Sequence, residues 1–240
     1  MWSKVAHARP DWGRARAALR TALWDGLAPQ RCLVCGAFGA ALHEACTSAL
    51  PAAGGRRCDR CWAPAVRLEA GTCARCALAP PAFAALRTPF VYAGAARAAV
   101  LEAKFAGRSA LLGPLGVAAA RAVPRGWAVE AVAWVPLHGR RRRTRGYDQA
   151  GLLARAVAAE LGVPLVGVLR RTRGTAPQAR LDAERRRANV VGAFAAERVG
   201  GGVLLVDDVT TTGSTLDAAA RALLAAGAAQ VFALAVARED

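Results

Sequence analysis

The sequence predicts an α/β fold: a largely parallel, Rossmann-type sheet with helices on both faces, preceded by a small cysteine-rich module. After Pro80-Pro81, apolar segments of strand length alternate with Ala-rich helical segments, as in sheets built from crossover units. Before this point, residues 32–76 hold all seven cysteines, six of them in Cys-x-x-Cys pairs. We therefore predict three regions: an N-terminal helix within residues 1–30, the cysteine-rich module at 31–80, and the α/β domain at 81–240.

The individual elements are expected from apolar periodicity and from Gly and Pro punctuation. Residues 11–25 form an amphipathic pattern whose apolar side chains fall near one face: Trp12, Leu19, Leu23 and Trp24. Strands are expected at residues 89–93, 129–136, 164–169, 203–206 and 231–236. Helices are expected at residues 95–105, 109–123, 149–161 and 214–226.

Composition, charge and cysteine spacing indicate the general class of protein. The 240 residues are 55% hydrophobic and carry a formal net charge of +16, which favours a folded protein with anionic partners such as phosphates or nucleic acid. Cysteines in metal-type spacing suit a reducing compartment better than secretion. No segment approaches the roughly 18 consecutive apolar residues of a membrane-spanning helix. We expect a cytoplasmic protein that does not insert into membranes.

The cysteine spacing predicts two structural zinc sites. Three Cys-x-x-Cys knuckles are joined by His43-x-x-Cys46, so seven cysteines and one histidine supply eight ligands. Short loop closure favours sequential sets, but closure entropy grows slowly with length, so interleaved pairing stays open. Neither set leaves an obvious open position for catalysis. The sequential sets are Cys32, Cys35, His43 and Cys46 for one ion, and Cys58, Cys61, Cys73 and Cys76 for the other.

The segment from 203 to 215 predicts a phosphate site. Four apolar residues run into two acids and then a hydroxyl-rich turn with one glycine that leads into a helix. A helix N-terminus favours phosphate, and acids accept hydrogen bonds from sugar hydroxyls. An ordinary helix cap would explain one or two hydroxyls, but not two acids and five hydroxyls within nine residues. The candidate residues are Asp207, Asp208, Val209, Thr210, Thr211, Thr212, Gly213, Ser214 and Thr215.

An Arg-rich stretch follows two of the expected strands. Residues 138–190 contain thirteen arginines and four acids, and Arg grips phosphate with two parallel hydrogen bonds. His138, Arg140 and Arg145 lie just after a strand, so we expect them at the same sheet edge as the phosphate loop. The stretch from 170 to 189 has no clear apolar period, and we interpret it as a mobile excursion. A merely solvated basic surface is the alternative interpretation.

The phosphate segment is similar to the 5-phosphoribosyl 1-pyrophosphate (PRPP) motif of type I phosphoribosyltransferases. The likeness lies in four apolar residues, two acids, two spacers and Thr-Thr-Gly-x-Thr. It implies that Asp207 and Asp208, as catalytic residues, hold the ribose 2′ and 3′ hydroxyls. It also implies that residues 211–215 wrap the 5′-phosphate and that Mg²⁺ bridges ribose and pyrophosphate.

The whole chain resembles the competence protein F family, in which a double zinc ribbon precedes a type I phosphoribosyltransferase domain. The chain departs from its pattern in two places: Tyr147-Asp148 stands where the family usually has Phe-Asn, and His43 where Cys is common. The marks of the resemblance are the cysteine knuckles, Lys104-Phe105, Val135-Pro136-Leu137, Arg145-Gly146-Tyr147-Asp148-Gln149, Gln178, Arg185 with Asn189, and residues 207–215.

The resemblance implies a role in natural transformation or in processing single-stranded DNA. Two hypotheses follow: a phosphoribosyltransferase of unknown acceptor, or a non-enzymatic competence factor that binds single-stranded DNA and uses the PRPP pocket for sensing or assembly. Other competence or DNA-processing proteins are expected partners. Trp62 either stacks on a base or packs in its own module.

Overall fold

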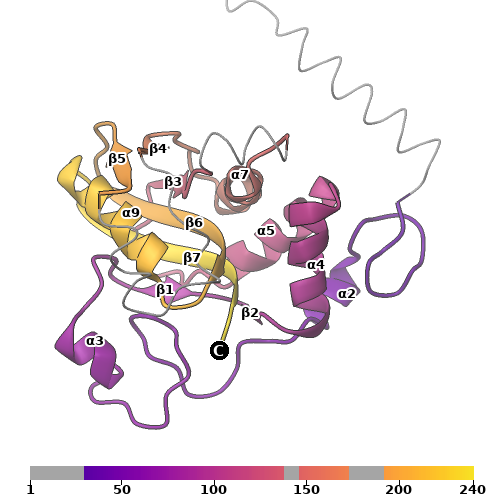
Figure 1. Cartoon of the computed structure of the whole chain (residues 1–240), viewed down its shortest axis with the longest axis horizontal. Helices are drawn as coiled ribbons and strands as arrows, with labels where there is room; N and C mark the ends of the chain where they lie inside the picture. The colour runs from indigo at the N-terminus through magenta and orange to yellow at the C-terminus, as the bar shows by residue number, and fades with distance from the viewer. Residues whose placement is uncertain (1–29, 138–145, 173–191) are drawn as a thin grey trace, which may run out of the picture.

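The computed structural model describes residues 30–137, 146–172 and 192–240. Its core is a five-stranded sheet, all parallel, in the order β1-β7-β6-β3 with β2 also paired to β7 (Figure 1). These strands are β1 (Leu86–Arg87), β2 (Phe90–Val91), β3 (Ala131–Trp134), β6 (Gly202–Thr210) and β7 (Gln230–Arg238). The predicted parallel sheet is therefore confirmed.

Alternating side chains of the central strand bury against opposite helical layers, because successive residues of a strand point to opposite faces. Leu204 and Val206 lie in one core cluster, with residues of three helices, and Val203 and Leu205 lie in the other, with residues of α9. Helices on both faces are thus confirmed. The first layer contains α4 (Gly94–Phe105), the 3₁₀ turn Ser109–Leu111 with α5 (Leu112–Arg121), and α7 (Gln149–Leu161), and the second contains α9 (Ser214–Ala225).

The strand predicted at 164–169 is wrong in extent. Within it, Leu165 forms a single parallel bridge with Val132, and the chain then leaves the sheet. The following residues form β4 (Leu169–Arg171), which pairs antiparallel with β5 (Phe194–Ala196) in a separate two-stranded sheet. Strands of two or three residues, such as β1 and β5, are too short to be predicted from the spacing of apolar residues in the sequence. The N-terminal helix predicted at 11–25 lies outside the described residues.

The cysteine-rich module docks at two separate places. Its first half, with the short helix α2 (Glu44–Ser48), is bound to α5 by the ion pair of Arg121 with Glu44 at 2.7 Å. Its second half, with α3 (Ala74–Leu78), lies away from α2, toward the β1 and α9 side (Figure 1). The module therefore contacts the α/β domain through two unrelated surfaces.

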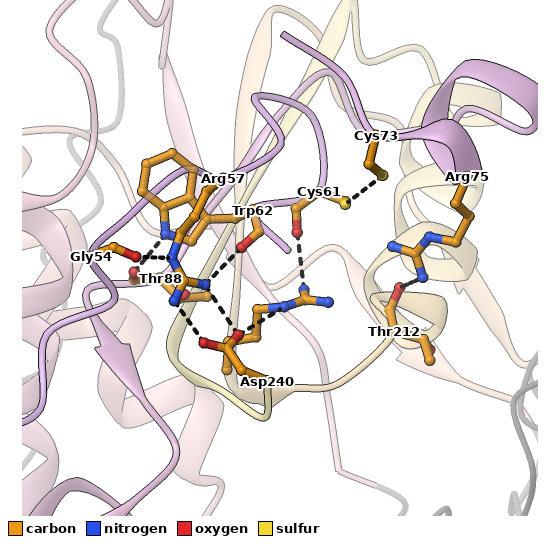
Figure 2. Close-up of polar contacts among 10 residues, drawn as sticks. Gly54, Arg57, Cys61, Trp62, Cys73, Arg75, Thr88, Thr212 and Asp240 are labelled. Atoms are coloured by element: carbon orange, nitrogen blue, oxygen red, sulfur yellow. Dashed lines mark hydrogen bonds and ion pairs between the residues drawn. The ribbon is translucent and has the colours of Figure 1, made fainter. Parts of the chain in front are cut away.

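The second half is bound to the C-terminal strand. Arg57 and Asp240 form a two-pronged ion pair, with Nη2 to Oδ2 at 2.6 Å, and Arg238 donates from Nη1 to the Cys61 carbonyl (Figure 2). The Trp62 indole donates to the Thr88 carbonyl at 3.0 Å, and Arg87 stacks over its ring. Trp62 thus packs at the junction of module and domain rather than standing out as a stacking platform.

Candidate functional site

The two acids lie within β6, because the strand continues beyond the predicted Val206 to Thr210. Asp208 pairs with Lys104 of α4, with Nζ to Oδ1 at 2.9 Å. The alternation of the strand turns Asp208 toward the α4 side of the sheet and Asp207 toward the other side. Backbone N–H groups also cap both carboxylates: Asp208 N donates to Asp207, and Val209 N donates to Asp208. The pair therefore straddles the carboxyl end of the central strand.

The protonation of Asp207 is unusual. Burial first, and then the neighbouring charge of Asp208, raises the pKa of Asp207 from its ordinary value to about 8. Lys104 and Arg171 oppose this rise but do not cancel it. Burial thus disfavours a negative charge on Asp207, while Lys104 forms its ion pair with Asp208.

The turn after β6 has the backbone geometry that its sequence requires. Gly213 has φ of 80° and is the N-cap residue of α9, a left-handed conformation that residues other than glycine rarely adopt. The Thr212 and Ser214 hydroxyls hydrogen-bond each other across it. The first N–H groups of α9 then point out of the helix, where they can bind an anion. The hollow inside this turn is lined by Asp207, Val209, Thr210, Thr211, Gly213, Ser214, Thr215 and Leu216.

The structure gathers the predicted metal ligands into the two sequential sets, so the interleaved alternative is not what the chain adopts. Within each set, the sulfur or imidazole atoms all lie within 4.8 Å of one another. A tetrahedral zinc with Zn–S bonds of about 2.3 Å would separate its sulfurs by about 3.8 Å. The Cys61 and Cys73 sulfurs are 3.8 Å apart, which fits that geometry.

Contacts around each set also suit a metal. His43 turns Nδ1 toward the Cys35 sulfur at 3.4 Å, while Nε2 lies 3.2 Å from the Phe38 carbonyl. Such a second contact fixes which ring nitrogen faces the ion. In the other set, Cys73 N donates to the Cys58 sulfur at 3.3 Å. Burial would raise the pKa of Cys58, but backbone hydrogen bonds outweigh it and lower this pKa to about 7. Both sets could therefore hold zinc.

Comparison with known proteins agrees with this geometry. Residues 148–239 match the phosphoribosyl transferase domain family. The chain is 33% identical over 183 residues to the DNA utilization protein YhgH of Salmonella typhimurium, which covers 72% of this chain and 80% of the relative. YhgH of Escherichia coli O157:H7 is 34% identical, and that of Escherichia coli K12 33%, over the same shares. The chain belongs to the competence protein F family.

Asp148, which departs from the usual pattern of the competence protein F family, has a local role. It is the N-cap residue of α7, and its Oδ1 accepts from Gly151 N at 3.3 Å. Its Oδ2 accepts from Trp134 Nε1 at 3.3 Å and from Leu137 N at 3.2 Å. An acid at an N-cap is favourable. The negative charge is therefore satisfied by donors of its own neighbourhood.

Lys104 is the site residue that sequence reasoning missed. The sequence marks Lys104 only as part of the family resemblance. Its ion pair with Asp208 depends on the position of the C-terminal end of α4 relative to β6. The signal available was that Lys104 is one of only two lysines among 33 basic residues. Tyr147 donates a hydrogen bond from its hydroxyl to the Ala103 carbonyl and so joins the segment at the start of α7 to the same end of α4.

The predicted anion-binding side chains after β3 are not placed by the structure. His138, Arg140 and Arg145 lie outside the described residues, as does most of the Arg-rich stretch from 170 to 189. Arg171, at the start of that stretch, is described: it stacks over Phe194 and lies close enough to Asp207 to oppose the rise in its pKa. No helix in the described ranges is both long enough and apolar enough to cross a membrane.

Proposed function

We propose that this protein binds PRPP with Mg²⁺ at residues 207–215 and transfers the phosphoribosyl group to an acceptor, acting in DNA uptake, natural transformation or the processing of single-stranded DNA. The observation that carries the proposal is the end of β6, where two acids precede a glycine-centred turn into the N-terminus of α9. Ligands of open α/β sheets bind beyond the carboxyl ends of the strands, where this turn lies.

Each part of the turn has a role in the proposal. Asp207 and Asp208 accept hydrogen bonds from the ribose 2′ and 3′ hydroxyls, and the N–H groups of residues 211–215 surround the 5′-phosphate. Mg²⁺, when bound, would neutralise charge on the pyrophosphate leaving group. His138, Arg140 and Arg145 are assigned to the same pyrophosphate, since they follow β3, the neighbour of β6. Lys104 compensates the charge of Asp208 before the ligand arrives.

The DNA role rests on the family and on charge. The similar proteins bear the name DNA utilization protein. A formal charge of +16 suits a polyanionic partner, and the expected partners include single-stranded DNA and other competence or DNA-processing proteins. The proposal includes a cytoplasmic location, because these partners and the zinc-type cysteine sets suit a reducing compartment.

A second candidate function is a non-enzymatic single-stranded-DNA-binding factor that uses the PRPP pocket for sensing or assembly. The net charge of +16 favours it, because basic side chains bind a polyanion without any turnover. The two functions differ in turnover and not in the ligands they bind.

Calorimetric titration with PRPP and Mg²⁺, repeated with a single-stranded oligonucleotide present, tests the proposal. We expect saturable PRPP binding that needs Mg²⁺, and oligonucleotide binding that weakens steeply as salt rises. PRPP binding that is absent while oligonucleotide binding persists would contradict the use of a PRPP pocket in both functions and leave only the binding of single-stranded DNA. Failure of both ligands to bind at low salt would contradict both functions.

A further inference from the structure

The second cysteine set reaches the phosphate turn directly. Arg75, which lies in α3 between Cys73 and Cys76, donates from Nη1 to the Thr212 carbonyl at 3.1 Å (Figure 2). Its guanidinium also interacts with the Cys61 sulfur, a ligand atom of the same set. One planar, half-buried guanidinium therefore interacts electrostatically with a predicted metal ligand and donates a hydrogen bond to the backbone of the turn.

The contact falls on the outer side of the turn. A cleft of about 80 Å³ separates the cysteine module from the turn. A different hollow, which includes Asp207, lies inside the turn. Gly213 and Ser214 line both. The outer cleft is lined by Arg75, Cys76, Ala79, Pro81, Phe83, Thr212, Gly213, Ser214 and Asp217.

Because the peptide bond is planar, the hydrogen bond from Arg75 to the Thr212 carbonyl also sets the direction of the N–H group that faces the inner hollow. In a planar trans peptide, the carbonyl of one residue and the N–H of the next point in opposite directions. Because Arg75 holds the Thr212 carbonyl toward the outer cleft, the Gly213 N–H is turned away from that cleft. Gly213 needs this help, since a glycine with φ of 80° has little steric reason of its own to keep one peptide orientation.

Two neighbouring contacts anchor the rest of the turn to the same junction. The Ala82 N–H donates to Asp217 Oδ1, in the first turn of α9, at 2.6 Å. Phe83 is 1% exposed and lies where a side chain on Gly213 would meet it, at 3.4 Å. The first cysteine set, by contrast, is joined to the 3₁₀ turn before α5 and to α5 itself, through Arg108 to the Arg31 carbonyl and Arg121 to Glu44.

We infer that Arg75 is a positioning residue that couples metal binding by the second cysteine set to phosphate binding at the turn. A bound ion would draw Cys73 and Cys76 together and so set the position of α3, from which Arg75 holds the Thr212 carbonyl. Coupling between two sites is reciprocal, so phosphate at the turn stabilises the metal in return. The phosphate half of this inference rests on the proposed function.

The first test measures backbone hydrogen exchange of residues 211–216 in the zinc-loaded full chain without any ligand. Arg75→Ala removes the guanidinium, Arg75→Lys keeps a charge and one donor, and Arg121→Ala is the matched control at the first cysteine set. We expect exchange to accelerate about tenfold in Arg75→Ala, because a hydrogen bond from a charged donor is lost, and less in Arg75→Lys. The control should exchange like the wild type.

The second test measures the release of zinc to a chromogenic chelator, with and without ribose 5-phosphate. We expect ribose 5-phosphate to slow the release of one of two zinc equivalents in the wild type and in Arg121→Ala, and of neither in Arg75→Ala. An Arg75→Ala protein that keeps two zinc equivalents, wild-type exchange and wild-type protection would overturn the coupling. If Arg75→Ala does not fold, Arg75→Lys replaces it, and wild-type hydrogen exchange in Arg75→Lys would likewise overturn the coupling.

The two tests keep the inference separate from the proposed function. If the wild type does not bind ribose 5-phosphate, the phosphate assignment fails. The exchange measurement still decides whether Arg75 holds the turn.

Discussion

Asp207→Asn combined with Asp208→Asn is expected to abolish measurable PRPP binding without unfolding the protein. Each acid is assigned to a ribose hydroxyl, and loss of one such hydrogen-bond partner costs about 1–3 kcal/mol. Losing both partners weakens binding by about 30-fold or more. Calorimetry with PRPP and Mg²⁺ measures the loss, and unchanged affinity would remove residues 207–215 from the assignment.

The pH dependence of folding stability provides a separate test of Asp207. The direction of this dependence follows from the pKa of Asp207. The folded pKa of about 8 lies above the ordinary 3.8, so the folded protein holds a proton that the unfolded chain has lost. Stability therefore falls as the pH rises from about 4 to about 8, and is not lowered by this group below that window. Asp207→Asn removes the effect, so we expect it to raise the melting temperature more at about pH 9 than at about pH 5.

Cys58→Ser is expected to remove one of two zinc equivalents and to destabilise the protein strongly. Structural zinc contributes on the order of 10 kcal/mol in small modules. The second cysteine set is bound to the C-terminal segment, where Arg238 donates to the Cys61 carbonyl and Asp240 pairs with Arg57. We expect the melting temperature to fall by about 10 °C or more. Metal analysis and thermal unfolding measure both effects.

Leu78→Ser provides the matched control for the cysteine experiment. Leu78 ends α3, the short helix that carries Cys76 of the same set, but its side chain is 89% exposed and is not a metal ligand. This variant should keep two zinc equivalents and the melting temperature of the wild type. If Cys58→Ser behaved in the same way, the second set would not be a structural metal site.

Local patterns were sufficient to predict the turn at residues 207–215 and the cysteine sets. The fully apolar strand, the two acids and Gly213 are adjacent in the chain, so their geometry depends on backbone preferences that sequence alone expresses. The sequential ligand sets close short loops, and the structure adopts them. Helix α7 has the bounds predicted for it, 149–161, and the structure marks its ends with a cap at Asp148 and the left-handed Gly162.

Strand lengths were less predictable because pairing partners decide them. β6 extends past Val206 to Thr210 because β7 offers hydrogen-bond partners along that whole length, up to Arg238. The segment at 164–169 has strand-like composition, yet it pairs only at Leu165 because the chain then turns away to form β4. Such outcomes depend on neighbours in space.

By itself, the sequence determined the fold class, the turn at residues 207–215 and two sets of metal-type ligands, because each is a short pattern with one favourable geometry. The tertiary structure alone decided that Lys104 neutralises Asp208 and that Arg75 holds the Thr212 carbonyl. These contacts join residues more than 100 positions apart, and no local preference specifies them. They arise only when the helices and the cysteine module pack onto the sheet.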